Sequence, residues 1–144
     1  MSSVQRVLIL CTGNSARSQM AEGLLRAMAG DRFDVRSAGT KPGSVRPEAI
    51  AVMSEIGIDI SAHRSKHVDE FADQTFDHVL TVCDNAREAC PIFPGHTHRI
   101  HHSFDDPAAV TGPEEERLSA FRRVRDQIRE YLETSGTGQG QLSG

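Results

Sequence analysis

Cys11 and Arg17 have the residue types and the spacing to do chemistry on an anion. The stretch CTGNSARS (11–18) directly follows the apolar run VLIL (7–10), and a helical pattern starts at Ser18. A loop that leads from a strand into a helix can turn several N–H groups toward an anion, which the helix N-terminus also attracts. Arg17 adds a planar fork of donors that matches two oxygens of a tetrahedral oxyanion. The predicted oxyanion cradle consists of Thr12, Gly13, Asn14, Ser15, Ala16, Arg17 and Ser18.

A thiol at the base of this cradle is a candidate nucleophile. The donors that hold an anion also stabilise a thiolate, so we expect the pKa of Cys11 to lie below the ~8.5 of a free thiol. A thiolate beneath a bound oxyanion can attack it and form a covalent adduct. The alternative is that Cys11 is a small buried residue at a strand end, followed by an ordinary turn.

Cys83 and Cys90 are candidates for a redox role. Cys83 ends the run DHVLTVC, and neighbouring strands of a parallel sheet lie about 4.8 Å apart, so its thiol could approach the anion loop from the side. The segment CDNAREAC is polar and unlike a core segment, although two buried cysteines without partners are the plain alternative. A zinc site is disfavoured because ligands paired at short spacing are missing.

Strand and helix patterns alternate along the chain. Continuous or alternating apolar residues predict strands, and apolar residues at helical spacing predict helices. This alternation favours parallel pairing, so the predicted fold is α/β: a single-domain, open, parallel four-stranded sheet with helices on both faces. Ligands bind such sheets at the carboxyl ends of the strands. The predicted strands are 7–10, 33–39, 77–83 and 96–102, and the predicted helices run from Ser18 to Gly30, from Pro47 to Gly57 and from Glu114 to Leu132.

Composition narrows the classes of partner. The 144 residues fit one domain, and the net charge of −4, with both signs interspersed, provides no basic surface for nucleic acid or anionic lipid. No stretch approaches a membrane span and MSSVQRVLIL is too weakly apolar for a signal peptide, so we expect a cytoplasmic protein. We expect residues 1–134 to form the domain and the Gly/Ser-rich tail, 135–144, to be disordered. No metal site is expected, because neither carboxylates nor cysteines match the histidines of 96–102.

The chemistry-bearing residues resemble a known family. The spacing of Cys11, Arg17 and Ser18 is similar to that in the phosphate loop of low-molecular-weight protein tyrosine phosphatases and of the arsenate reductases that share their fold. A wider set resembles the thioredoxin-coupled arsenate reductases over nearly the whole chain before the tail. That set comprises CTGNSARSQMAEG (11–23), SAG (37–39), DIS (59–61), Cys83, Cys90 and FDDPA (104–108).

The resemblance implies a role for each cysteine. Cys11 would attack arsenate while Arg17 and the loop amides hold its oxygens. Cys83 would then attack the sulfur of the adduct, so that arsenite leaves and a Cys11–Cys83 disulfide forms. Cys90 would convert this bond to Cys83–Cys90, which thioredoxin would reduce. The implied partners are arsenate, with phosphate or sulfate as mimics, and reduced thioredoxin as the electron donor, with no bound cofactor.

Further positions bear on the reaction that the resemblance implies. Asp105 matches the acid that protonates the departing oxygen, and Asp106 is either the alternative acid or a turn residue. Ala108 replaces an aromatic residue of phosphatase relatives, which weakens recognition of aryl phosphates. Lys66 replaces an aspartate of potassium-binding relatives, so we expect no potassium requirement; the other potassium positions are matched by Asn14, Glu22 and Ser37.

Three classes of function therefore remain. Phosphate and arsenate have similar shape and charge, so the cradle alone does not separate a phosphatase from a reductase. Arsenic accepts two electrons from thiols, which requires a second sulfur within reach. We expect a thioredoxin-dependent arsenate reductase. The alternatives are a low-molecular-weight phosphatase and a non-catalytic anion-binding or thiol redox-sensing module.

Overall fold

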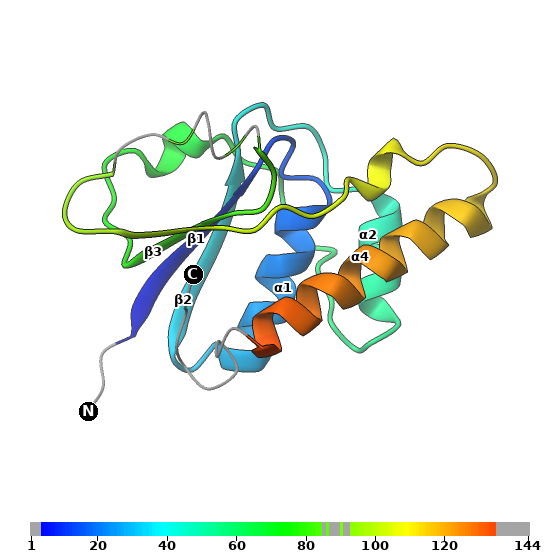
Figure 1. The fold of residues 1–144 in the computed structure, drawn as a ribbon, viewed down its shortest axis with the longest axis horizontal. Helices are drawn as coiled ribbons and strands as arrows, with labels where there is room; N and C mark the ends of the chain where they lie inside the picture. The colour runs from blue at the N-terminus through cyan, green and yellow to red at the C-terminus, as the bar shows by residue number, and fades with distance from the viewer. Residues whose placement is uncertain (1–3, 85, 87–89, 91–92, 135–144) are drawn as a thin grey trace.

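A parallel four-stranded sheet forms the centre of the protein. The computed structural model describes residues 4–84, 86, 90 and 93–134. The strand order is β2-β1-β3-β4, and all pairs are parallel, which confirms the predicted α/β fold (Figure 1). The strands are β1 (Gln5–Cys11), β2 (Phe33–Gly39), β3 (His78–Thr81) and β4 (His98–His101).

The described α-helices pack together beside the sheet. They are α1 (Arg17–Ala29), α2 (Pro47–Ser54) and α4 (Glu114–Thr134). The first, α1, packs against β1 and β2, and α4 packs against both α1 and α2, so these helices gather on one side (Figure 1).

A short 3-10 helix that the sequence patterns did not predict lies between α2 and β3 along the chain. This helix, η1 (Val68–Phe71), brings Phe71 edge-on to Phe76, with ring centroids 5.8 Å apart. The guanidinium of Arg6 lies over the Phe76 ring at 4.5 Å, and Arg6 precedes the apolar run of β1. Because successive side chains of a strand alternate between faces, Arg6 marks the face opposite Val7.

The strand β1 is buried on both faces, which explains why polar and apolar residues do not alternate in VLIL. All four side chains, Val7 to Leu10, are fully buried. In the sheet register, Cys11 lies opposite Gly39 and Leu10 lies opposite Thr81. The ends of β1, β2 and β3 therefore meet at one edge, and residues 12–16 leave the sheet there.

Element boundaries differ slightly from the predicted ones. The helix α2 ends at Ser54, and a turn continues to Gly57, whose φ of 80° suits glycine. The strand β3 ends two residues before Cys83. The predicted disordered tail, 135–144, and most of the segment between Cys83 and Cys90 lie outside the described residues. Over the described part of the chain, no helix combines the length and the apolar character needed to cross a bilayer.

Candidate active site

The loop after β1 has its carbonyl groups turned outward. They accept hydrogen bonds from the neighbouring segment 40–46, which runs alongside the loop. Because the C=O and N–H groups of one peptide unit point in opposite directions, the corresponding N–H groups face the concave side of the loop, as an anion cradle requires. The bonds run from Thr40 N to Cys11 O (3.2 Å), from Lys41 N to Thr12 O (2.9 Å), from Gly43 N to Gly13 O (3.0 Å) and from Arg46 N to Ser15 O (2.9 Å).

Asn14 holds the middle of this loop. Its backbone has a φ of 48°, which a non-glycine residue rarely adopts, and its side chain is fully buried. The side-chain oxygen accepts from the backbone N–H of Lys66 (2.9 Å) and from Gln19 Nε2 (3.0 Å). The side-chain nitrogen donates to Ser18 Oγ (2.8 Å) and Ser37 Oγ (2.9 Å). Every polar atom of the amide is thus bonded, so the strained backbone is held by contacts from three parts of the chain.

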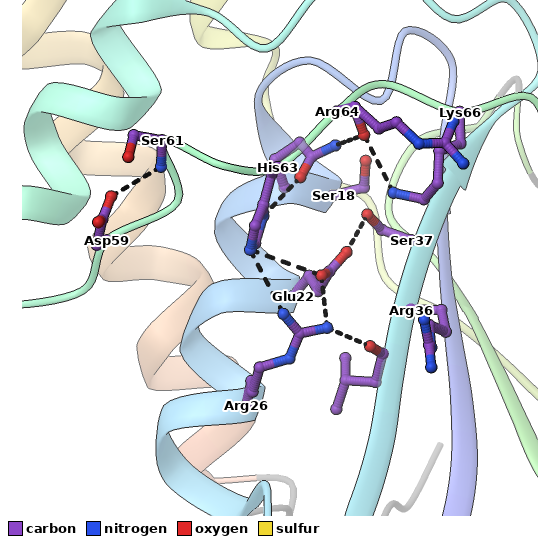
Figure 2. A network of polar contacts seen from close by, with 12 residues as sticks. Ser18, Glu22, Arg26, Arg36, Ser37, Asp59, Ser61, His63, Arg64 and Lys66 are labelled. Atoms are coloured by element: carbon purple, nitrogen blue, oxygen red, sulfur yellow. Dashed lines mark hydrogen bonds and ion pairs between the residues drawn. The ribbon is translucent and has the colours of Figure 1, made fainter.

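A second layer of polar contacts supports these partners (Figure 2). Ser37 Oγ donates to Glu22 at 2.5 Å, and Glu22 forms an ion pair with Arg26 at 2.7 Å. His63 Nδ1 lies 2.9 Å from Gln19 Oε1. Since the Gln19 nitrogen donates to Asn14, its oxygen must accept, so Nδ1 of His63 carries a hydrogen. The loop is therefore braced by α1, β2 and the segment that contains His63.

Two thiols meet beneath the loop. Cys11 and Cys83 are hydrogen-bond partners and are only 3% and 5% exposed. The Cys83 sulfur also lies 3.2 Å from Thr12 Oγ1 and accepts from the backbone N–H of Ala86 at 3.4 Å. The structure thus brings a second sulfur to the anion loop from the neighbouring strand.

This contact controls the ionisation of the pair. It lowers the pKa of Cys83 to about 5, with help from the Thr12 and Ala86 hydrogen bonds and from Arg17. The contact with Cys83, together with burial, raises the pKa of Cys11 despite the opposing charge of Arg17. Two thiols in contact disfavour ionisation of both at once, and the contacts in this structure favour the thiolate at Cys83. The expected lowering of the Cys11 pKa is wrong for this arrangement, because that expectation considered the cradle without the second thiol.

Arg17 and Asp106 close the site from the other side. Arg17 Nη1 donates to Phe104 O at 3.1 Å, and Nη2 lies 3.8 Å from Asp106 Oδ2. Arg17 Nε is buried without a hydrogen-bond partner, so the guanidinium retains a donor. The other oxygen of Asp106 caps the short helix η2 (Pro107–Ala109) by accepting from Ala108 N at 3.0 Å.

Asp105 points elsewhere. Its exposed side chain lines a groove of about 460 Å³ along α4, together with Glu130 and Tyr131. The structure therefore does not bring Asp105, the acid favoured from the sequence, to the loop arginine. The adjacent residue, Asp106, has that place.

Cys90 lies beside β4 rather than in the cradle. Its half-buried sulfur accepts a long hydrogen bond from Arg99 Nη1 at 3.8 Å. Both residues line a cavity of about 170 Å³ next to β3 and β4. Burial raises the pKa of Cys90, and the charge of Arg99 lowers it.

Comparison with known proteins agrees with this geometry. The family model of low molecular weight phosphotyrosine protein phosphatases matches residues 6–135. The chain belongs to this phosphatase family. Among curated relatives, an arsenate reductase of Halalkalibacterium halodurans is 47% identical, covering 89% of this chain and 92% of that protein. An arsenate reductase of Bacillus subtilis is 45% identical, covering 89% of this chain and 95% of that protein.

Solved structures of arsenate reductases share the family fold. An arsenate reductase in its phosphate-binding state has a TM-score of 0.68 and 32% identity, covering 91% of this chain and 95% of that chain. A thioredoxin-dependent arsenate reductase of Corynebacterium glutamicum has a TM-score of 0.69 and 29% identity, covering 97% of this chain and 65% of that chain.

Two supports of the loop after β1 could not be predicted from the sequence. Segment 40–46 acts through backbone N–H groups, which every residue except proline has. Gln19 sits on the buried side of α1 and donates to both oxygens of Asn14, yet a glutamine in a helix is an ordinary surface residue by type. Only the structure identifies these two as parts of the site.

The residues present do not fit potassium. The Asn14 side-chain oxygen already accepts from two N–H groups, and the Ser37 hydroxyl donates to Glu22. Burial lowers the pKa of Lys66 and the charge of Glu22 raises it, so the ammonium of Lys66 interacts with the same carboxylate. Within the described residues, no three His, Cys, Asp or Glu side chains gather as metal ligands.

Potassium should therefore have no specific effect. At equal ionic strength, the melting temperature and the affinity for phosphate should be the same in potassium chloride and in sodium chloride. The Lys66→Asp variant, which removes the ammonium and adds a carboxylate, should acquire a difference between the two salts. A wild-type melting temperature that is higher in potassium would contradict this assignment.

Gly39 should be required for the loop to keep its shape. A Cβ atom at this position would lie 2.4 Å from Thr12 O and 2.9 Å from Asn14 N, so backbone must move. We expect Gly39→Ala to destabilise the fold by about 1–3 kcal/mol and to weaken phosphate binding, measured by thermal unfolding and calorimetry. The matched control is Gly43→Ala in the adjoining segment, where a Cβ meets nothing within 4 Å. Equal phosphate affinity in the two variants would place the anion elsewhere.

Proposed function

We propose that this protein reduces arsenate to arsenite, with thioredoxin as the electron donor. The observation that carries the proposal is the contact between Cys11 and Cys83 at the anion loop. A hydrolase of this family needs one thiol and water, whereas reduction needs two thiols that can form a disulfide. The arsenate reductases among the relatives, one of them thioredoxin-dependent, support the same choice.

The first step is attack on arsenate by Cys11. The cradle amides and Arg17 bind the arsenate oxygens and favour negative charge directly above Cys11. The Cys11–Cys83 pair has one thiolate available. For the attack, the proton of Cys11 passes to Cys83, and the loop N–H groups and Arg17 stabilise the resulting Cys11 thiolate. A sulfur–arsenic bond forms, and one arsenate oxygen leaves as water after protonation.

Asp106 supplies that proton in our proposal. It is the carboxyl group beside Arg17, at 3.8 Å. An oxyanion held by Arg17 lies on the side of the site where Asp106 is, so this carboxyl group is in place to give a proton to the departing oxygen. Asp105, which faces the groove along α4, lacks this position.

The second step uses Cys83. Its thiolate, stabilised by Thr12 and the Ala86 N–H, attacks the Cys11 sulfur, and the sulfur–arsenic electron pair passes to arsenic. Arsenic is thereby reduced by two electrons, arsenite leaves, and Cys11–Cys83 becomes a disulfide. Cys90 then attacks Cys83 and frees Cys11. Thioredoxin reduces the resulting Cys83–Cys90 bond, a cycle suited to the reducing cytoplasm.

The phosphatase alternative rests on a smaller part of the site. Cys11, Arg17 and Asp106 are the groups that attack on a phosphate ester needs, so weak hydrolysis of small phosphate esters is consistent with either function. The phosphatase alternative gives no role to Cys83 and Cys90.

Turnover with thioredoxin tests the proposal. Thioredoxin, thioredoxin reductase and NADPH should support sustained NADPH oxidation that depends on arsenate. The Cys90→Ser variant should release about one arsenite per chain and then stop, because the Cys11–Cys83 bond is shielded inside the loop. Cys83→Ser should abolish even this single release, and Cys11→Ser should abolish reduction and ester hydrolysis together.

Each contrary result selects another function. Sustained turnover by Cys90→Ser would eliminate the three-cysteine relay. Ester hydrolysis without any arsenate turnover in the wild type would indicate a phosphatase. Absence of both activities, with phosphate binding intact, would indicate an anion-binding or redox-sensing module.

The two aspartates can be separated by single substitutions. Asp106→Asn preserves the cap of η2 but removes the acid, so single-turnover arsenite release should slow by about 10²–10⁴. Asp105→Asn should behave as the wild type. The reverse order of the two rates would return the acid role to Asp105.

A further inference from the structure

Arg99 of β4 is the cation beside the third cysteine. Its Nη1 atom lies 3.8 Å from the Cys90 sulfur, outside the anion loop. We propose that Arg99 is a positioning residue of the thiol relay, which favours the thiolate form of Cys90 when this residue attacks the Cys11–Cys83 disulfide. This inference rests on the proposed reduction of arsenate, because only a relay requires Cys90 to be a nucleophile.

The sheet register holds Arg99 in this place. Arg99 lies opposite Val79, and His101 lies opposite Thr81, so the four side chains share one face of the β3–β4 pair. These residues line the cavity of about 170 Å³ together with Cys90. A sulfur beside open space can move without displacing packed atoms, which the transfer to Cys83 requires.

The other polar groups of this face are engaged with one another. His101 Nδ1 lies 2.7 Å from Thr81 Oγ1, and its Nε2 lies 3.0 Å from Asp84 Oδ1. His101 and Asp84 thus form their own pair at the start of the segment that leads to Cys90. Among the described residues, Arg99 is the charged group hydrogen-bonded to the Cys90 sulfur.

The positive charge of Arg99 acts on the ionisation of Cys90. Burial raises the pKa of Cys90 and Arg99 opposes that effect. Only a thiolate attacks a disulfide, so a cation that increases the thiolate fraction accelerates the transfer. Cys90 loses its proton to water and bonds to Cys83, the Cys11–Cys83 bond breaks, and Cys11 leaves as a thiolate that takes up a proton. One disulfide replaces another, with no net change in electrons.

Arg99→Gln and Arg99→Lys test the role of the charge, with Arg36→Gln on the opposite edge strand β2 as the control. Arsenate is added without thioredoxin, and transfer is followed by alkylation of the freed Cys11 and mass spectrometry. At pH 7 the Gln variant should transfer the disulfide about three- to tenfold more slowly, while Lys should restore most of the rate. Release of the first arsenite should be unchanged in all variants, because it needs only Cys11 and Cys83.

The pH dependence of the transfer rate distinguishes an effect of the Arg99 charge from a structural effect of the substitution. The deficit of Arg99→Gln should close as the pH rises, because Cys90 then ionises without help. A deficit that is equal at all pH values, equal rates for Gln and Lys, or no deficit would each overturn the role of Arg99. If the wild type releases no arsenite, the proposed function itself fails. If the wild type releases arsenite normally and Arg99→Gln transfers at its rate, only the role of Arg99 fails.

Discussion

The anion loop depends on the buried amide of Asn14. A left-handed backbone at an asparagine costs free energy of order 1 kcal/mol, and a buried amide with an unpaired atom would cost more. The bonds to Ser18, Ser37, Gln19 and Lys66 offset both costs, and they come from α1, β2 and the segment after α2. Because the loop turns at this point, its carbonyl groups face segment 40–46 and its N–H groups face the cradle. Loss of the amide would therefore affect anion binding without touching the anion.

The contact between the thiols is the second constraint, and it opposes the first. The cradle favours negative charge at Cys11, whereas the hydrogen bonds from Thr12 and Ala86 favour it at Cys83. In the proposed reaction Cys11 attacks first and Cys83 second. Only one of them is a thiolate at a time, because two thiolates in contact would repel each other. In the proposed reaction, arsenite leaves as Cys83 bonds to the Cys11 sulfur, so the second step uses the same contact between the two residues.

Strong local patterns made most of the fold predictable. The run VLIL, the helical spacing in α1 and α4, and Pro47 at the start of α2 each determine an element with little help from distant residues. The helix η1 and the support from segment 40–46 were missed because they depend on tertiary contacts and backbone donors. The position of the carboxylate beside Arg17 was harder still to predict. Asp105 and Asp106 are adjacent and identical in type, and only the cap of η2 turns one of them toward Arg17.

The strand order suits the proposed relay, in which electrons pass from a protein reductant inward to a closed site. Cys11 ends β1, which has neighbours on both sides, Cys83 follows β3, and Cys90 lies beside the edge strand β4. The three thiols are thus ordered from the centre of the sheet to its edge, and burial falls in the same order, from 3% and 5% exposure to a half-buried side chain. A protein reductant is too large to enter the cradle, so the proposed relay requires the disulfide to move to a place that the reductant can reach. In that relay, the transfer from Cys11–Cys83 to Cys83–Cys90 moves the disulfide outward by one strand and frees Cys11 for the next arsenate.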